Sequence, residues 1–419
     1  MNRRILAILL AMALVFCAFS FTACNQNNDG ENEGEDKIKI GVISVGDENE
    51  GYTYAHMDGI RKAAEKLGID EATQIIWKNN IPESELCKDA ALDLADADCD
   101  LVISNSYGHQ DFMQEAATEC PDVQFVSMTG DKAANSGLDN LANAFTSVYQ
   151  SRYVSGVVAG MKLAELVKDG KLTDANYDAD GNILLGYVGA YPYAEVVSGY
   201  TAYYLGVKSV VENVSMLVQY TQSWFDIAAE GEAANALLAK GCVIICQHAD
   251  STGAPAAVEA SLKAGNVCYS VGYNVDMLSV APNAALTSAT NNWAVYYEYL
   301  FNAVMKGEEV KTNWSEGYAT DAVAITALGA SCAEGTQEKV ESVVKALKDG
   351  TLNVFDTDSF TVNGEHLESY KVDLTGDFDT DDEGDKEAIW DGYFHESEHR
   401  SAPSFDIRID GITELSDEQ

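Results

Sequence analysis

Large aromatic side chains recur beside amides, carboxylates and histidines, each time just after a run of apolar residues. Aromatic rings can sandwich a flat heterocycle, and Asn and Asp side chains can bond its edge or a sugar hydroxyl. The candidate ligand-binding residues are Tyr52, Tyr54, His56, Asn105, Ser106, Tyr107, Trp224, His248, Asp250, Tyr273, Asn274, Asn291 and Asn292. We therefore predict a cleft for a small ring-containing ligand, while any single ring could instead cap a strand or pack between lobes.

The histidines His56, His109 and His248 all follow predicted strands, and three imidazoles can hold a metal ion. The chain has no short-range metal motif such as HxH or HExxH, so hydrogen bonding to a ligand is favoured, and we predict no metal and no cofactor. It also lacks GxSxG, a P-loop and a GxGxxG after the first predicted strand. A binding protein is therefore favoured over an enzyme, and an extracytoplasmic hydrolase stays as a remote alternative.

The segments that must position these residues alternate between strand and helix. Residues 38–45 form a short β-rich run, residues 54–67 repeat apolar positions at helical spacing, and residues 100–104 form a second clear strand. The alternation continues in two runs, about 38–146 and about 147–289, with a further helix over 293–305. Such βαβ repeats predict an α/β fold with two mainly parallel sheets, whose ligands bind beyond the carboxyl ends of the strands.

The charge balance of the chain is strongly acidic. Its 419 residues include 67 Asp and Glu against 26 Lys and Arg, for a formal net charge of −41, and 47% of the residues are hydrophobic. The hydrophobic share is sufficient for globular cores. A chain of this charge is repelled by phosphate backbones, so we predict no nucleic-acid partner.

The N-terminus has the features of an export signal. Arg3 and Arg4 precede fifteen residues, 5–19, without a charged side chain, a stretch that is short for a membrane span. The sequence Phe-Thr-Ala-Cys that ends at Cys24 resembles the lipobox of bacterial lipoproteins. We predict a signal peptide over 1–23, lipidation of Cys24, and a lipid-anchored flexible tether over 24–36. The alternative is an ordinary cleaved signal in which Cys24 is incidental.

Cysteine usage does not indicate a disulfide framework. Of nine cysteines, Cys17 would leave with the signal and Cys24 would carry the lipid, so an odd number remains. No pair has CxxC spacing. We therefore predict that the remaining cysteines are mainly buried free thiols that act as small apolar side chains.

Several longer segments resemble the BMP family of bacterial lipoproteins, the substrate-binding components of ABC importers that include purine nucleoside receptors. The matching segments, in family order, are IKIGVISVGDENEGYTYAHMDGIRKAAEKLG, LVISNSYGHQD, CPDVQFVSMTG, SRYVSGVVAGMKL, SWFD, CQHADSTGAP, SVGYNVDM and LTSATNNWAVYY. The resemblance implies a type I periplasmic-binding-protein fold, in which two Rossmann-like lobes joined by three hinge crossings enclose a ligand in a hinged cleft.

The resemblance also implies how the chain divides. An N-terminal lobe would comprise residues 37–146 and about 290–314. A C-terminal lobe would comprise residues 147–289 and about 315–330. Residues 331–419 would form a C-terminal extension that packs on the lobes.

Carried over residue by residue, the resemblance gives roles to a few positions. Tyr54 lies where the family places a ring that stacks on the base, and Trp224 matches the opposing ring. Asn274 stands where an acid accepts ribose hydroxyls in the family, and Asn291 stands where nucleoside receptors have a lysine. These two departures leave a purine nucleobase and a purine nucleoside both open as ligands. Asp226 is expected to cap a helix.

The function implied is that of an extracytoplasmic, lipid-anchored monomer that captures a purine-type ligand and delivers it to an ABC permease. One alternative is a receptor for another small planar solute, such as a flavin-like ring. A second is a lipoprotein that senses its ligand and does not take part in import.

Overall fold

The computed structural model describes residues 37–374 and 384–416. The predicted signal peptide, Cys24 and the predicted tether lie outside the described residues. The described residues from Ile38 onward form one compact unit that contains two large sheets. Within the described ranges, no helix combines the length and apolar character needed to cross a bilayer.

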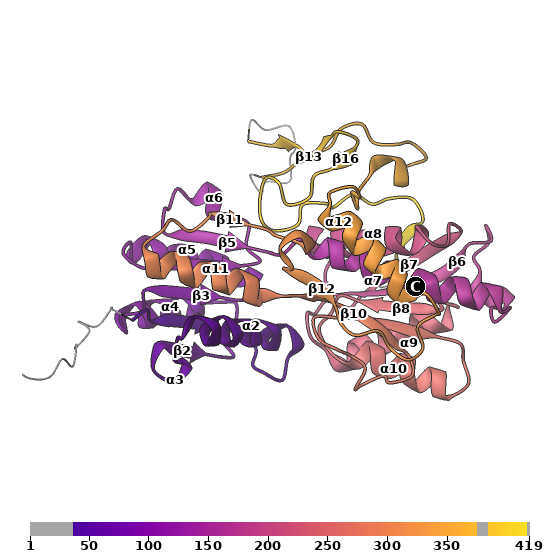
Figure 1. Cartoon of the computed structure of the whole chain (residues 1–419), viewed down its shortest axis with the longest axis horizontal. Coiled ribbons are helices and arrows are strands. Elements are labelled where there is room, and N and C mark those ends of the chain that lie inside the picture. The colour runs from indigo at the N-terminus through magenta and orange to yellow at the C-terminus, as the bar shows by residue number, and fades with distance from the viewer. Residues whose placement is uncertain (1–36, 375–383, 417–419) are drawn as a thin grey trace, which may run out of the picture. The chain divides into compact units, whose positions relative to one another are not determined.

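The first sheet is parallel throughout and holds most of the N-terminal strands (Figure 1). In spatial order its strands are β11 (Asn313–Trp314), β5 (Leu141–Ala144), β4 (Gln124–Met128), β3 (Leu101–Ser104), β1 (Ile40–Ile43) and β2 (Ile75–Lys78). Its helices are α2 (Gly51–Leu67), α3 (Glu71–Gln74), α4 (Glu85–Asp96), α5 (Gln110–Glu119), α6 (Ala133–Ser136) and α11 (Trp293–Lys306). We call this half the N lobe. Strands β1, β3 and β5 are buried on both faces, as expected for a parallel sheet covered by helices, whereas only Ile75 of the edge strand β2 is buried.

The second sheet is parallel except for one edge strand, and we call this half the C lobe. In spatial order its strands are β12 (Val323–Ile325), β10 (Ala285–Asn291), β9 (Tyr269–Tyr273), β8 (Ile244–Gln247), β6 (Ile183–Gly189), β7 (Val214–Tyr220) and β17 (Ile412–Glu414). Its helices are α7 (Val148–Lys168), α8 (Ala194–Lys208), α9 (Ile227–Ala239) and α10 (Gly253–Lys263). The antiparallel strand is β12, which pairs with β10.

The chain passes between the two sheets at three places: from β5 to α7, from β10 to α11, and from β11 to β12. After the second crossing, α11 packs on α2, and Figure 1 shows the orange α11 among the indigo and purple elements of the N lobe. We propose lobe boundaries at these crossings.

Residues 331–419, as far as they are described, add to the C lobe. Helix α12 (Thr336–Lys348) packs on α7, and β17 extends the second sheet by pairing in parallel with β7. Two short hairpins pair β13 (Lys371–Val372) with β14 (Lys386–Glu387) and β15 (Ile389–Trp390) with β16 (Tyr393–Phe394). The rings of Phe355 and Phe405 stack with centroids 4.2 Å apart inside the core of the C lobe. We call this segment the C-terminal extension.

Local signals explain several helix ends. Helix α2 ends at Gly68, whose φ of 71° is a left-handed conformation that glycine adopts without strain. Helix α9 is capped by Asp226, whose Oδ1 accepts hydrogen bonds from the backbone N–H groups of Ala228 and Ala229. The predicted capping role of Asp226 is therefore confirmed. Among the described residues, the cysteines are free and most are buried, which agrees with their predicted role as apolar side chains.

Helices α7 and α8 approach each other so closely that only glycine fits at their crossing. A Cβ atom built on Gly156 would lie 2.1 Å from the carbonyl oxygen of Tyr203, and one on Gly206 would lie 2.1 Å from the carbonyl oxygen of Tyr153. Because both obstacles are backbone atoms inside buried helices, they cannot move aside without shifting a helix.

We expect Gly156→Ala to lower the free energy of unfolding by about 1–3 kcal/mol, because the added methyl group forces α7 away from α8. Gly231→Ala in α9 is the matched control, since a Cβ there would meet no atom closer than 3.6 Å. The control should be neutral or slightly stabilising. Urea unfolding followed by circular dichroism measures both, and equal unfolding midpoints for the two variants would contradict the prediction.

Candidate functional site

A pocket of about 390 Å³ lies between the lobes, beyond the carboxyl ends of both sheets. Its volume is within the range of small-molecule binding sites. It is lined by Val45, Gly46, Asp47, Asn49, Glu50, Tyr52, Asn80, Glu83, Ser106, Tyr107, Thr129, Glu195, Trp224, Phe225, His248, Asp250 and Tyr273. Both lobes therefore contribute side chains to one enclosure.

On the N-lobe side the pocket wall is built by the loop after β1, the start of α2 and the loop after β3. The Tyr52 hydroxyl donates a hydrogen bond to the carbonyl oxygen of Asn105, which fixes the ring at the pocket. The Ser106 hydroxyl donates to Glu83 Oε1 at 2.6 Å, and the same oxygen accepts from the backbone N–H of Gly108 at 2.9 Å. Glu83 thus holds the loop that carries Tyr107.

On the C-lobe side a group of aromatic rings surrounds the pocket. The rings of Trp224 and Tyr191 meet edge to face with centroids 5.2 Å apart, and the rings of His248 and Tyr273 lie 4.9 Å apart. Tyr193 stacks on Tyr191 at 5.2 Å. The ring of Tyr193 also lies 6.2 Å from Tyr107 of the opposite lobe, so aromatic rings meet across the cleft.

Several carboxyl groups line the pocket, and burial changes how readily two of them ionise. Burial raises the pKa of Glu195 to about 7, while the positive charge of Arg152 acts in the opposite direction. Burial, followed by the neighbouring charges of Glu50 and Glu230, raises the pKa of Asp250 well above its usual range. Two carboxyl groups at the pocket are therefore harder to ionise than free ones.

His248 is held neutral in this wall. Burial, followed by the charge of Arg152, lowers its pKa well below the usual value. Its Nε2 lies 3.3 Å from Glu195 Oε1, and its Nδ1 lies 3.2 Å from the hydroxyl of Tyr187. A neutral imidazole satisfies both contacts when Nε2 donates to Glu195 and Nδ1 accepts from Tyr187.

Arg152 on α7 supplies positive charge behind the pocket wall. Its side chain is fully buried, and its guanidinium carbon lies 3.6 Å from the ring centroid of Tyr273. Its Nη1 donates to the carbonyl oxygen of Gln247 at 2.6 Å. The cation therefore lies under the aromatic wall and offsets part of the carboxylate charge without lining the pocket.

A family model for PnrA-like ABC transporter substrate-binding proteins, named Bmp, matches residues 37–356. The chain belongs to this family. A purine-binding protein of Brucella abortus (strain 2308) is 30% identical over 327 residues, which cover 78% of this chain and 85% of that protein. A putative ABC transporter glucose-binding protein of Haloferax volcanii is 28% identical over 338 residues, which cover 79% of this chain and 77% of that protein.

Solved structures of solute-binding proteins share the fold. One from Aeropyrum pernix K1 superposes with a TM-score of 0.63 at 17% identity and covers 76% of this chain and 93% of its own. One from Conexibacter woesei DSM 14684 superposes with a TM-score of 0.58 at 19% identity and covers 75% of this chain and 98% of its own. The predicted α/β fold of the type I periplasmic-binding-protein class is therefore confirmed, with two parallel sheets facing one cleft.

For this Bmp-family chain, the sequence-predicted residues divide into two groups. Those that line the pocket are Tyr52, Ser106, Tyr107, Trp224, His248, Asp250 and Tyr273. Those that do not line it are Tyr54, His56, Asn105, Asn274, Asn291 and Asn292. That any of them contacts a ligand stays a prediction.

The position of Tyr54 differs from the expectation for a stacking ring. Its side chain is 45% exposed and lies outside the pocket. The physical reason is that α2 begins at Gly51, earlier than the sequence suggested, so Tyr52 and Tyr54 occupy helical positions two apart and point in nearly opposite directions. Tyr52 takes the place at the pocket that was expected for Tyr54.

Asn274 and Asn291 support the pocket from behind. Asn274 Nδ2 donates to Asp250 Oδ1 at 2.6 Å, and Asn291 Nδ2 donates to Asn274 Oδ1 at 3.0 Å. Thr146 in turn donates to Asn291 Oδ1. This chain of hydrogen bonds fixes the carboxyl group of Asp250, which lines the pocket. The two amides therefore lie beside the pocket as predicted from the sequence, but they bond Asp250 and do not line the pocket themselves.

The remaining predicted residues outside the pocket have structural partners. Asn105 Oδ1 accepts from the backbone N–H of Val45 at 2.9 Å. His56 stacks on Trp293 with centroids 4.3 Å apart, and burial lowers its pKa to about 3. Asn292 Nδ2 donates to the carbonyl oxygen of Asp321 at 2.9 Å.

The three histidines considered as metal ligands do not converge. His109 Nε2 bonds the carbonyl oxygen of Ile81 at 3.0 Å, His56 contacts the Tyr297 hydroxyl, and His248 lies in the C-lobe wall. Over residues 37–374 and 384–416, no group of three His, Cys, Asp or Glu side chains is placed to hold a metal ion.

Sequence reasoning missed most of the acidic lining. The overlooked acidic residues are Asp47, Glu50, Glu83 and Glu195, and Thr129 and Phe225 were overlooked as well. Asp47 and Glu50 lie in a strand-exit loop that was recognised, but acids are so abundant in this chain that none stood out. Glu83 was missed because β2, the strand that precedes it, was not predicted.

We expect the carboxyl of Glu195 to make stability depend on pH. Its pKa rises from 4.5 to about 7 on folding, so the native state keeps a proton that the unfolded chain releases, and stability falls as pH rises through this window. The loss is at most about 3 kcal/mol for a shift of this size. Glu195→Gln removes the titrating group, so the unfolding free energy of the wild type relative to this variant should fall between about pH 4.5 and 7 and level off above.

Urea unfolding at a series of pH values measures this difference. Glu232→Gln, on the exposed face of α9, is the matched control and should parallel the wild type. If the difference in unfolding free energy between the wild type and Glu195→Gln stays constant from pH 4.5 to 8, the pKa of Glu195 is not raised on folding and the prediction is wrong.

Proposed function

We propose that the protein is an extracytoplasmic receptor of an ABC importer that binds a purine nucleobase or nucleoside in the cleft between its lobes. The observation that carries the proposal is the combination, in one pocket, of aromatic rings with carboxyl groups from both lobes, of which Asp250 is buried. A purine offers the complementary features, namely a flat π-system and N–H donors along its edge.

The charge of the pocket supports a neutral, donor-rich ligand. Glu50, Glu195 and Asp250 all face the pocket, whereas the cation of Arg152 stays behind Tyr273. Carboxyl oxygens accept hydrogen bonds from ring N–H groups, amino groups or sugar hydroxyls. Asp47 also lines the pocket, and hydrogen bonds from Asn49 lower its pKa, so its carboxylate stays ionised and repels phosphate. A nucleobase or nucleoside therefore suits the pocket better than a nucleotide.

The relative from Brucella abortus, a purine-binding protein, supports the same ligand class. The relative from Haloferax volcanii, a putative glucose-binding protein, makes glucose the appropriate competitor. Asp250 with its supporting amides can accept from two hydroxyls of a ribose as well as from a base, so nucleobase and nucleoside both belong to the proposal.

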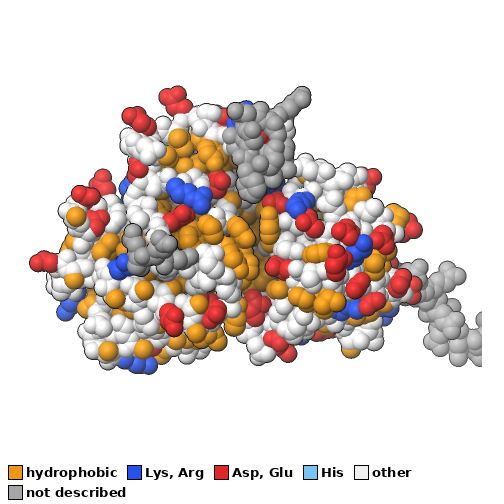
Figure 2. Space-filling model, turned by 180° about the vertical axis from the view of Figure 1, so that it is seen from behind, with side chains coloured by type: hydrophobic (Ala, Val, Ile, Leu, Met, Phe, Trp, Pro, Cys, Tyr) orange, Lys and Arg blue, Asp and Glu red, His pale blue; other side chains and the backbone are white. Residues whose placement is uncertain are grey.

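The proposal includes anchoring and delivery. Cys24 would carry the lipid, residues 24–36 would act as the tether, and a monomeric receptor would hand its ligand to an ABC permease at the outer face of the membrane. Acidic side chains are spread over the visible face of the molecule (Figure 2), and this argues against a nucleic-acid partner.

Calorimetric titration of the chain lacking residues 1–24 with adenine, guanine, adenosine, guanosine, guanosine monophosphate and glucose tests the ligand class. We expect a nucleobase or nucleoside to bind, the nucleotide to bind at least about tenfold more weakly because of carboxylate repulsion, and glucose not to compete. Binding of glucose without any purine would overturn the proposal.

Chromatography should detect no free base released from the nucleosides above a no-protein control, and steady release would favour a hydrolase.

Trp224→Ala should weaken binding of the best purine by at least tenfold, about 1.4 kcal/mol, because the indole at the pocket supplies stacking area. Tyr54→Ala is the matched control, since Tyr54 lies outside the pocket, and its affinity should match the wild type. The reverse pattern, a loss with Tyr54→Ala alone, would restore the arrangement expected from the sequence.

A further inference from the structure

The C-terminal extension contacts the two lobes in different ways. Toward the C lobe it contributes Phe355, Phe360, Phe394, Phe405 and Ile407 to a continuous apolar core. Among the described residues, the two apolar cores of the N lobe contain no residue after Ala322. The extension is therefore an integral part of the C lobe and meets the N lobe through other kinds of contact.

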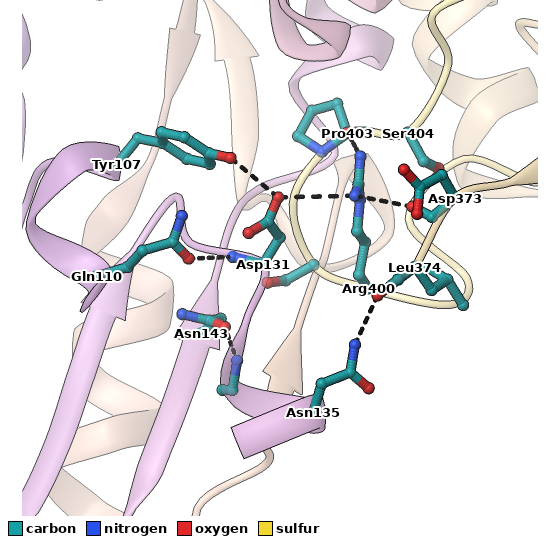
Figure 3. Close-up of polar contacts among 12 residues, drawn as sticks. Tyr107, Gln110, Asp131, Asn135, Asn143, Asp373, Leu374, Arg400, Pro403 and Ser404 are labelled. Carbon is teal, nitrogen blue, oxygen red and sulfur yellow. Dashed lines mark hydrogen bonds and ion pairs between the residues drawn. The ribbon is translucent and has the colours of Figure 1, made fainter. Parts of the chain in front are cut away.

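Those contacts are polar. Arg400 Nη1 lies 3.6 Å from Asp131 Oδ2 in the N lobe. Asn135 Nδ2 donates to the carbonyl oxygen of Leu374 at 2.6 Å, and the backbone N–H of Ser401 donates to Asn313 Oδ1 at 3.2 Å. Figure 3 shows Arg400 reaching from the extension toward Asp131.

Both partners of the ion pair are held in place. Arg400 Nη2 donates to the carbonyl oxygen of Pro403 at 3.0 Å, which fixes the guanidinium within the extension. The backbone N–H of Asp131 donates to Gln110 Oε1 at 3.0 Å, and that of Ala133 donates to Asn143 Oδ1 at 2.7 Å. The loop that carries Asp131 is thus fastened to the body of the N lobe, as Figure 3 also shows.

The ion pair reaches the ligand pocket through a single oxygen atom. Asp131 Oδ2, which faces Arg400, also accepts a hydrogen bond from the hydroxyl of Tyr107 at 3.2 Å. Tyr107 lines the pocket and lies 6.2 Å, ring to ring, from Tyr193 of the C lobe. A side chain of the extension is therefore two contacts away from a ring that lines the pocket.

We propose that Arg400 is a positioning residue for ligand retention. Through Asp131 it holds Tyr107 at the pocket and connects the C lobe to the N lobe, and we call the contact between Arg400 and Asp131 the strap. The proposal deepens the proposed function and rests on it for the identity of the ligand. The extension moves with the C lobe, to which it is joined by an apolar core, and its polar contacts can break and re-form when the N lobe swings. The ion pair keeps some access to water, with 17% of each side chain exposed, so water can take the place of the partner when the contact breaks.

Hydrogen exchange of the full-length, ligand-free chain tests the strap without any ligand. Arg400→Ala should raise amide exchange severalfold in peptides covering residues 105–112 and 129–137. Lys386→Ala, which removes an exposed positive charge from the same extension, is the matched control and should leave these peptides unchanged. Unchanged exchange in Arg400→Ala would overturn the strap.

Dissociation of guanosine followed by stopped-flow tryptophan fluorescence tests retention. Arg400→Ala should speed dissociation by about fivefold with little change in association, and Arg400→Lys, which keeps the charge, should recover most of the loss. In a Tyr107→Phe background the effect of Arg400→Ala should shrink, because the link through the hydroxyl is already absent.

Faster amide exchange with an unchanged dissociation rate would overturn the positioning role. If guanosine and every other purine fail to bind, the proposed function fails, and the strap is judged on hydrogen exchange alone.

Discussion

The C-lobe wall of the pocket places the carboxyl groups of Glu195 and Asp250 where water has limited access, and this constraint governs the chemistry of the site. Burial opposes ionisation of Glu195 and Asp250, so each needs a compensating partner. Arg152 supplies charge from behind the wall, and the amides of Asn274 and Asn291 supply hydrogen bonds. The carboxyl oxygens that these partners leave without a hydrogen bond face the pocket, where the N–H or O–H groups of the proposed ligand would meet them.

The fold produces this concentration of polar groups directly. In both sheets all strands but β12 run in parallel, so their carboxyl ends lie at one edge of each sheet, and the pocket lies between these two edges. Loops that would be scattered over the surface of an antiparallel protein are thereby brought around one enclosure. Their rings and acids line it while the apolar strands remain buried in separate lobe cores.

The sequence predicted the architecture well because alternating apolar strands and amphipathic helices leave a strong pattern. It predicted fewer details of the structure where tertiary packing determines whether a strand forms. Strand β2 was missed because only Ile75 of its four residues is buried, and β17 was missed because a short edge strand has no pattern of its own. In the site, their places after predicted strands were enough to predict that Trp224, His248 and Asp250 lie at the pocket. Which of Tyr52 and Tyr54 lines the pocket depends on where α2 begins, and the sequence pattern placed that start too late. Arg152 was not singled out because it lies inside a helix far along the chain from the loops it supports.

One side chain that lines the pocket also packs against residues at the crossings between the lobes. Phe145, Val148, Tyr273 and Ala289 form a small apolar cluster of their own. Phe145 and Val148 flank the first crossing, and Ala289 lies on β10 just before the second. Tyr273 belongs to this cluster and also lines the pocket, with Arg152 stacked on its ring. The ring of Tyr273 is therefore held by the crossings on one side and by Arg152 on the other, which fixes this part of the pocket wall to the junction between the lobes.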